Sequence, residues 1–178
     1  PAHTLVLEDG SVRGALVAIA GRAGEIRASR GVVLATGGFP HDASRIAGLF
    51  PHAPTGKEHW SAAPRTNTGD GLRLGESAGG RVRTDLAAAG GWAPVSLVPL
   101  PDRTFSHFPH LGMDRAKPGA IMVRPSGERF CNEADSYHDV TRALFDTTLP
   151  DEPAQAWLVC DHRFVRRWGV GRVRPAPF

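Results

Sequence analysis

Cysteine is scarce in this chain of 178 residues, which contains only Cys131 and Cys160. The two residues form neither a C-x-x-C motif nor a disulfide framework, so a fold held together by several disulfides is excluded. No apolar run reaches the roughly 18 residues that a membrane-spanning helix needs. These absences predict a reduced, cytoplasmic chain without a membrane span.

An excess of charge of one sign is also lacking. The chain has 21 Lys and Arg against 18 Asp and Glu, which gives a net charge of +3. Acidic and basic residues are interspersed until the arginines of 163–174, so nucleic-acid binding is not predicted. His52 and His59, and likewise His107 and His110, lack supporting ligands at metal-site spacing. We therefore predict no metal, and we expect these histidines on solvated loops; a place for His107 or His110 in the lining of a substrate pocket is the alternative.

Glycine and proline are plentiful, with 21 and 15 residues, which predicts short regular elements and long loops. Asp9-Gly10 between two apolar runs is a strong hairpin signal, and a third strand is expected near 26–28. The stretch 92–118 is rich in proline and is expected to be irregular. Other expected strands are 32–35, 121–123, 129–131 and a buried one at 156–161. Expected helices are 41–50, with Asp42 as its cap, 72–78, 137–145 and 162–168.

The apolar run 32–35 is continuous, which is typical of a strand buried on both faces of a parallel sheet. Ligands of such sheets lie beyond the carboxyl ends of the strands, where Gly37 and Gly38 would let a ligand approach the backbone. A plain turn from strand to helix is the alternative that the residues leave open. Asp70 is expected to cap the helix 72–78, whose exposed amides could face an anionic group.

The segment 119–139 combines a turn at Pro125-Ser126-Gly127 with a polar run and the only tyrosine of the chain. Residues 121–123 and 129–131 are expected to form a hairpin around this turn. Asp135 or Ser136 is expected to cap the following helix, which Tyr137 opens. Apolar residues at Tyr137, Val140, Leu144 and Phe145 share one helical face.

Three motifs in this order resemble a flavoprotein family: VVLATGGF at 32–39, NTGDG at 67–71 and GAIMVRPSGERFCNE at 119–133. The family contains fumarate reductases, the flavoprotein subunits of succinate dehydrogenases and 3-ketosteroid Δ1-dehydrogenases. The resemblance covers most of this chain but only part of the family's length. It implies an internal fragment of α/β plus α+β class. Residues 1–88 would be part of a doubly wound FAD-binding domain, and 89–178 part of an inserted capping domain.

The resemblance also implies the residues of the site. FAD would be held by residues of the first two motifs: Ala35, Thr36, Gly37, Gly38, Phe39, Thr68, Gly69, Asp70 and Gly71. Three further residues would support the site without taking part in catalysis: Arg129, Asn132 and Glu133. Glu133 would be an ion partner of Arg129.

Tyr137 is the catalytic residue that the resemblance implies. In fumarate reductases an arginine at this position, five residues after the Asn of N-E, donates a proton and clamps the substrate. The steroid dehydrogenases have a tyrosine here, which takes a proton from the carbon beside a carbonyl while hydride passes to flavin N5. An alternative for Tyr137 is a purely structural role in the apolar face of its helix.

The expected function is therefore desaturation of a carbon–carbon bond next to a ketone in a hydrophobic, steroid-like substrate. No motif identifies the electron acceptor. A fumarate reductase-like or enone-reducing flavoenzyme is an alternative. A second alternative is a non-catalytic domain that cannot hold FAD by itself, because the G-x-G-x-x-G loop that binds the FAD pyrophosphate is absent from this sequence.

Overall fold

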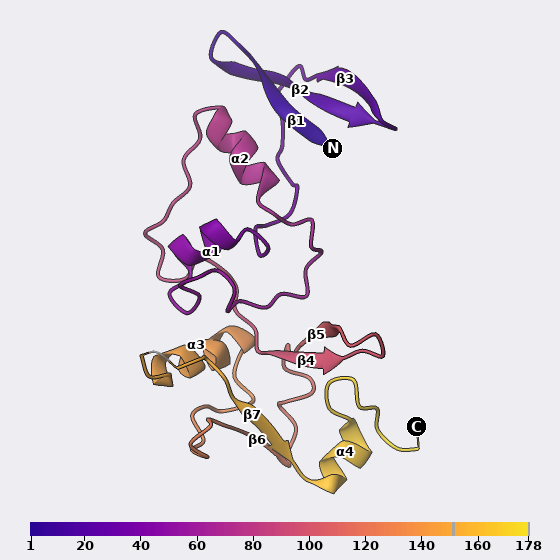
Figure 1. Ribbon diagram of the computed structural model, residues 1–178, viewed down its shortest axis with the longest axis vertical. Coiled ribbons are helices and arrows are strands. Elements are labelled where there is room, and N and C mark those ends of the chain that lie inside the picture. Colours follow the sequence, from indigo (N-terminus) through magenta and orange to yellow (C-terminus); the bar gives the residue numbers. More distant parts are fainter. Residues whose placement is uncertain (151, 178) are drawn as a thin grey trace.

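The computed structural model describes residues 1–150 and 152–177. The molecule is elongated, with one sheet at the N-terminal end, two helices in the middle and the remaining elements at the other end (Figure 1). In chain order the elements are β1 (Ala2–Glu8), β2 (Ser11–Ile19), β3 (Arg22–Arg27), α1 (Ala43–Leu49), α2 (Asp70–Ser77), β4 (Val95–Pro99), β5 (Phe105–Pro109), β6 (Ala120–Val123), α3 (Tyr137–Thr147), β7 (Trp157–Cys160) and α4 (His162–Trp168).

The N-terminal sheet is an antiparallel meander of β1, β2 and β3. The hairpin predicted at Asp9-Gly10 is confirmed, because both residues have positive φ, at 49° and 73°, and Glu8 pairs with Ser11. This is the backbone of a two-residue hairpin turn that matches the twist of the strands. The third strand begins at Arg22, earlier than expected, because the chain already turns at the preceding Ala20-Gly21.

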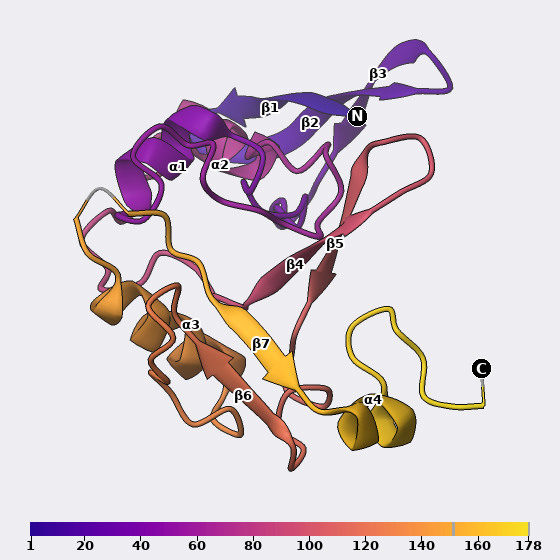
Figure 2. The same cartoon turned by 60° about the horizontal axis from the view of Figure 1, so that its bottom comes forward.

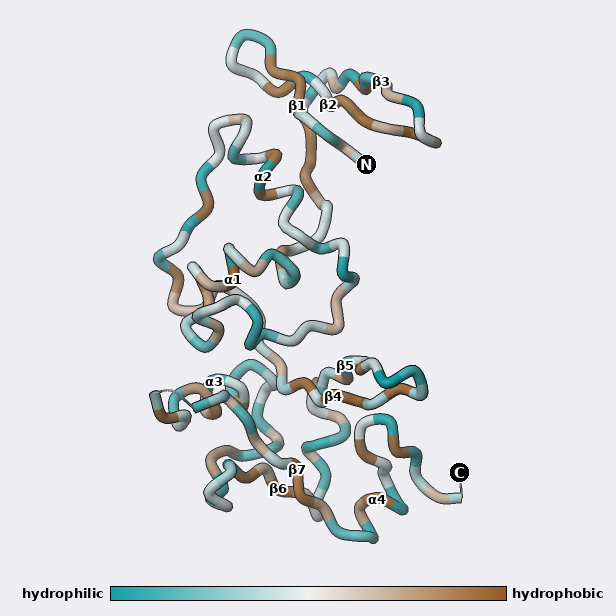
Figure 3. The backbone as a smooth tube through the Cα atoms, in the orientation of Figure 1, coloured by the Kyte–Doolittle hydropathy of each residue, from teal (hydrophilic) through white to brown (hydrophobic). Residues whose placement is uncertain are grey.

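The expected strand 32–35 is wrong for this structure. The run is irregular, and within the described residues no strand pairs with it. Val33 is 89% exposed, so the run is not buried either. It appears as the brown stretch that leads from the sheet toward α1 (Figure 3). A strand of a parallel sheet depends on neighbouring strands for its hydrogen bonds, and the sheets among the described strands are all antiparallel.

The two middle helices begin close to where they were predicted. Asp42 caps α1, and its carboxylate accepts a hydrogen bond from the Arg45 amide at 3.2 Å. In α2, however, Asp70 is the first helical residue and Gly69 is the N-cap, with φ 81°. The prediction of Asp70 as the cap is therefore wrong, since the left-handed backbone at the cap favours glycine.

The stretch 92–118 is not entirely irregular, because β4 and β5 form an antiparallel hairpin. Val95 pairs with Pro109 and Pro99 with Phe105, so both prolines lie at strand ends, where a missing N–H is tolerated. His110 follows directly and is only 6% exposed, which corrects the expectation of a surface loop.

β6 pairs with β7, with Ile121 opposite Val159, and not with residues 129–131. A single bridge between Val123 and Arg129 is what remains of the expected hairpin. The sequence could not identify β7 as the partner of β6, because β7 lies more than thirty residues further along the chain. The two strands and α3 lie together in both ribbon views (Figure 2).

β7 is not the buried strand that its apolar sequence predicted. Trp157 and Val159 are 56% and 50% exposed. They lie opposite Val123 and Ile121, so one face of this two-stranded sheet is largely solvated. The helix predicted after β7 is confirmed as α4, with Gly169 at its C-terminus.

The apolar core consists of α1, the loop after it and Trp92. The buried cluster contains Ile46, Phe50, Ala53 and Trp92, and Phe145 from α3 packs against it. Ser136 caps α3, as one of the two expected candidates. None of the described helices combines the length and apolar character that crossing a bilayer requires.

Candidate functional site

The two glycine-containing motifs at 35–39 and 68–71 lie against each other. The Gly69 amide donates to the Gly38 carbonyl oxygen at 3.1 Å. The His41 amide donates to the backbone carbonyl oxygen of Asn67 at 3.2 Å. The segments are about thirty residues apart in the sequence, yet backbone hydrogen bonds hold them side by side. The structure thus brings the two predicted groups of flavin-site residues together.

The packing between these motifs requires glycine. A Cβ added at Gly71 would lie 2.5 Å from Thr36 Oγ1, and one at Gly37 would lie 2.8 Å from Asn67 Oδ1. Gly37 also has a φ of 85°. A larger residue at Gly71 or Gly37 would force the side chain of Thr36 or Asn67 out of its present position, and at Gly37 it would also strain the backbone.

Several backbone amides near this junction are available to a ligand. Within the described residues, the amides of Gly37 and Gly38 donate to no protein acceptor. Residues 35–38 are exposed, and α2 begins without a side-chain cap. Uncapped amides at the start of a helix, next to an exposed glycine turn, suit an anionic or polar part of a cofactor such as FAD.

Two pairs of an arginine and a carboxylate stabilise α2, one at its start and one near its end. Arg73 donates to the Thr68 carbonyl at 2.6 Å and pairs with Asp70. Arg45 of α1 pairs with Glu76 of α2, and the pKa of Glu76 is lowered by this hydrogen bond. These contacts fix α1, α2 and the intervening turn as one unit.

Tyr137 lies apart from the two glycine motifs, in the first turn of α3. Its side chain is 41% exposed, so it is not sealed in the core. Within the described residues, its hydroxyl makes no hydrogen bond, whereas its carbonyl accepts one from Thr141 at 2.8 Å. The phenol is therefore free to contact a ligand.

Glu133 and Arg129 form the ion pair that was predicted. Glu133 is 5% exposed, and its carboxylate accepts from Arg129 at 3.0 and 2.6 Å and from the Met122 amide at 2.7 Å. Burial by itself raises the pKa of Glu133, but these hydrogen bonds outweigh it and lower the pKa to about 2. Asn132 accepts from the Ala134 amide at 3.2 Å and stabilises the same loop.

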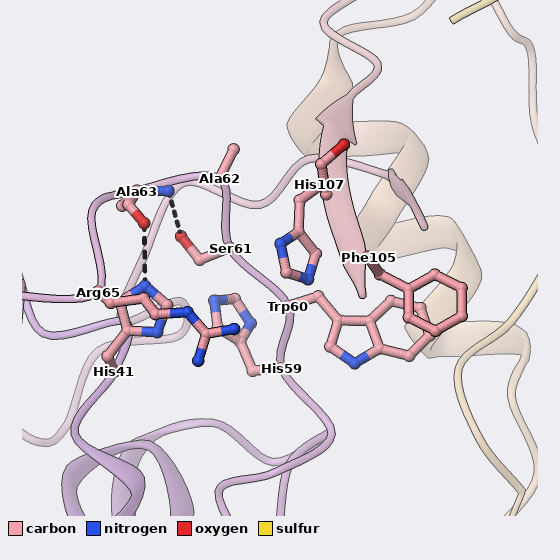
Figure 4. A pocket seen from close by; sticks show the side chains of 10 residues that line it. His41, His59, Trp60, Ser61, Ala62, Ala63, Arg65, Phe105 and His107 are labelled. Carbon is pink, nitrogen blue, oxygen red and sulfur yellow. Dashed lines mark hydrogen bonds between the residues drawn. The ribbon is translucent and has the colours of Figure 1, made fainter. Parts of the chain in front are cut away.

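A cavity of about 370 Å³ lies between the loop 59–65 and strand β5 (Figure 4). The imidazoles of His41 and His59 and the guanidinium of Arg65 lie at one side of it, the rings of Trp60 and Phe105 at the other, and His107 between them (Figure 4). Its main lining residues are His41, His59, Trp60, Arg65, Phe105 and His107. None of the residues predicted to bind FAD lines it, and neither does Tyr137. Trp60 was the available signal, since a tryptophan in a polar loop often contacts a ligand or partner.

His52 and His59 are half-buried, which corrects the expectation that they are solvated. His52 Nε2 lies 3.3 Å from His59 Nδ1, and the His52 ring stacks on Phe145 at 4.1 Å. Burial, and then the neighbouring His59, lower the pKa of His52 to about 4. Burial also lowers the pKa of His59. The described residues include no group of three or more His, Cys, Asp or Glu side chains that could hold a metal.

Comparison with known proteins is consistent across three kinds of match. The family model described as "FAD binding domain" matches residues 1–169. A 4-oxocyclohex-2-ene-1-carboxylate 5-dehydrogenase of Sinomonas cyclohexanicum is 33% identical over 172 residues, which cover 96% of this chain and 28% of that protein. A 3-oxosteroid 1-dehydrogenase of Mycobacterium tuberculosis is 35% identical over 156 residues, covering 84% of this chain and 26% of that protein.

Among solved structures, the fold is similar to that of 3-ketosteroid delta1-dehydrogenase from Sterolibacterium denitrificans, in complex with 1,4-androstadiene-3,17-dione. The TM-score is 0.78 at 29% sequence identity, over 98% of this chain and 31% of that one. The chain thus spans less than a third of the length of each of these relatives.

Proposed function

The chain belongs to the FAD binding domain family, whose cofactor is FAD, and from this we propose that the protein is a flavin-dependent dehydrogenase of ring ketones. It would desaturate a carbon–carbon bond next to the carbonyl. The observation that carries the proposal is the close packing of the two glycine motifs, which leaves a row of free amides where the family resemblance expects FAD. The related dehydrogenases are named for ring ketones of two sizes, a steroid and a cyclohexene carboxylate.

The first part of the mechanism is cofactor binding. The amides of Gly37 and Gly38 and the uncapped start of α2 would hold the anionic part of FAD, with Thr36 and Thr68 beside them. FAD, when bound, supplies the acceptor for the hydride. Residues 1–88 would belong to its doubly wound domain and 89–178 to the capping domain.

The second part is proton removal by Tyr137. Its exposed phenol stands at the N-terminus of the 11-residue helix α3, where a ligand can reach it. A phenolate there would accept the proton from the carbon next to the substrate carbonyl. Glu133 and Arg129 would hold the preceding loop in place without touching the substrate.

The test of the proton step is the substitution Tyr137→Phe in the FAD-loaded protein. Mixing the protein with a 3-ketosteroid or with 4-oxocyclohexanecarboxylate, in the absence of an electron acceptor, should bleach the flavin absorbance. We expect the rate to fall by about 10²- to 10⁴-fold in the variant, the usual contribution of an acid–base group. An unchanged rate would remove Tyr137 from the mechanism. If the oxidised protein does not bleach with either ketone, and an enone alone restores the flavin absorbance of the reduced protein, the protein is instead an enone reductase.

The cofactor site has a separate test. Gly71→Val places methyl groups against Thr36, so we expect loss of bound FAD. Gly91→Val is the matched control, because a Cβ at Gly91 meets no atom within 4 Å. Equal FAD content in the two variants would show that the junction of the glycine motifs does not bind the cofactor.

A further inference from the structure

Arg115 is among the most deeply buried side chains of the described chain, with only 1% of its surface exposed. Its Nε donates to the His110 carbonyl oxygen at 3.2 Å, and its two terminal nitrogens donate to the carbonyl oxygens of Glu133 and, at 2.8 Å, Asp135. Within the described residues, it forms no salt bridge with a carboxylate. Backbone carbonyls alone therefore satisfy this buried cation.

The carbonyls that Arg115 binds come from two separate parts of the chain. His110 follows strand β5, and its ring is anchored to Ser96 Oγ of β4 at 2.6 Å and to the Asp114 carboxylate. Glu133 and Asp135 precede α3 directly. The guanidinium thus connects the β4–β5 hairpin to the segment that leads into Tyr137.

The same segment is held from its other side. The Glu133 carboxylate accepts from the Met122 amide of β6 at 2.7 Å. The Ser136 hydroxyl oxygen then accepts from the Asp139 amide at 3.1 Å and starts the helix. Residues 133–136 are therefore fixed through both backbone and side chains immediately before the phenol.

A buried guanidinium is unfavourable unless its donors are satisfied, and its planar fork binds only acceptors in a matching arrangement. Lysine could not reach three carbonyls in the same way, since it has one nitrogen. The position of these carbonyls therefore depends on the shape of the side chain and not only on its charge.

We propose that Arg115 is a positioning residue for Tyr137, holding the phenol at the place where it meets the substrate. This inference rests on the proposed function for the catalytic role of Tyr137, whereas the hydrogen bonds of Arg115 are independent of that role. Arg115 itself touches no substrate, because its side chain is enclosed by protein.

The experiment uses the signal of Tyr137 itself. Tyr137 is the only tyrosine in the chain, so labelling with 3-fluorotyrosine gives one fluorine resonance. We expect Arg115→Met and Arg115→Lys to shift and broaden this resonance. We also expect hydrogen exchange at the Asp139 amide to become about tenfold faster or more, since the N-cap bond loses its support. Phe164→Leu, at another site that is 1% exposed and lies in α4, is the control that lowers stability while leaving the Arg115 hydrogen bonds in place.

The result that overturns the proposal is a fluorine resonance unchanged by Arg115→Lys, or one that Phe164→Leu moves equally at a similar loss of melting temperature. Arg115→Lys retains the charge and serves if Arg115→Met does not fold. In the FAD-loaded protein, positioning predicts a fall of about 10²-fold in kcat with little change in KM. If Tyr137→Phe keeps full turnover while the fluorine signal still responds to Arg115, the proposed function fails and the positioning stands.

Discussion

Acid should destabilise this protein through His52 in a window that the structure defines. The ring of His52 is half-buried between Phe145, at 4.1 Å, and Trp92, at 5.0 Å, with His59 beside it. Burial first, and His59 second, lower its pKa from 6.5 to about 4, although Glu58 acts in the opposite direction. The full difference corresponds to about 3 kcal/mol. Because the ring is only half-buried, solvent screening reduces this to about 1–2 kcal/mol.

The stability falls with the pH because the unfolded chain binds the His52 proton more tightly than the folded chain does. Below pH 6.5 the unfolded chain protonates His52, whereas the folded chain resists protonation until about pH 4. Unfolding therefore takes up a proton across this window, so the free energy of unfolding falls as the pH falls. His59 acts in the same direction, since burial also lowers its pKa.

The assay is urea unfolding followed by far-ultraviolet circular dichroism, at several pH values from above 6.5 down to about 4. His52→Phe keeps an aromatic ring against Phe145 but cannot be protonated. We expect this variant to lose about 1–2 kcal/mol less stability across the window than the unsubstituted protein. His3→Phe, on the exposed first strand, should keep the original pH dependence. Parallel curves for the unsubstituted protein and His52→Phe would refute the reasoning.

Three further substitutions test separate features of the structure. Glu133→Gln should cost about 2 kcal/mol at neutral pH, because it weakens the bonds to Arg129 and Met122. It should also abolish the stability loss that the carboxylate contributes between pH 4.5 and about 2, as measured by acid titration of unfolding. Gly56→Ala should lower the free energy of unfolding by about 2–4 kcal/mol, seen as a lower melting temperature. The reason is that the φ of Gly56 is 76° and a Cβ would collide with the backbone of α1. Gly48→Ala in α1 meets no atom within 4 Å, and calorimetry should show a gain of about 0.5–1 kcal/mol.

The features that sequence predicted correctly depend on neighbouring residues. Asp9-Gly10 needs only its own positive φ values to turn a hairpin, and Asp42 and Ser136 cap helices through residues three positions away. Arg129 and Glu133 are likewise four residues apart. Each of these features is determined by a few consecutive residues, so it can be predicted without knowledge of the rest of the fold.

The features that failed depend on distant partners. The run 32–35 has the composition of a buried strand, but composition does not say which strands lie beside it. β6 pairs with β7, and the burial of His52 depends on Phe145, far away in the sequence. The glycine motifs were identified from their sequence, but the packing of Gly71 against Thr36 is visible only in the three-dimensional structure.

Trp92 has a mechanical consequence for any movement of the helix that carries the phenol. Its indole is wedged edge-on against Phe50 at 4.5 Å, while its own amide donates to His138 Nδ1, at 3.2 Å, in the first turn of α3. Trp92 thus contacts both the middle of the molecule, through Phe50 after α1, and the helix α3, through His138. If α3 moves to admit a substrate, a rotation about Trp92 would preserve both contacts. A translation of α3 along its axis would break the hydrogen bond to His138 or separate the indole from Phe50.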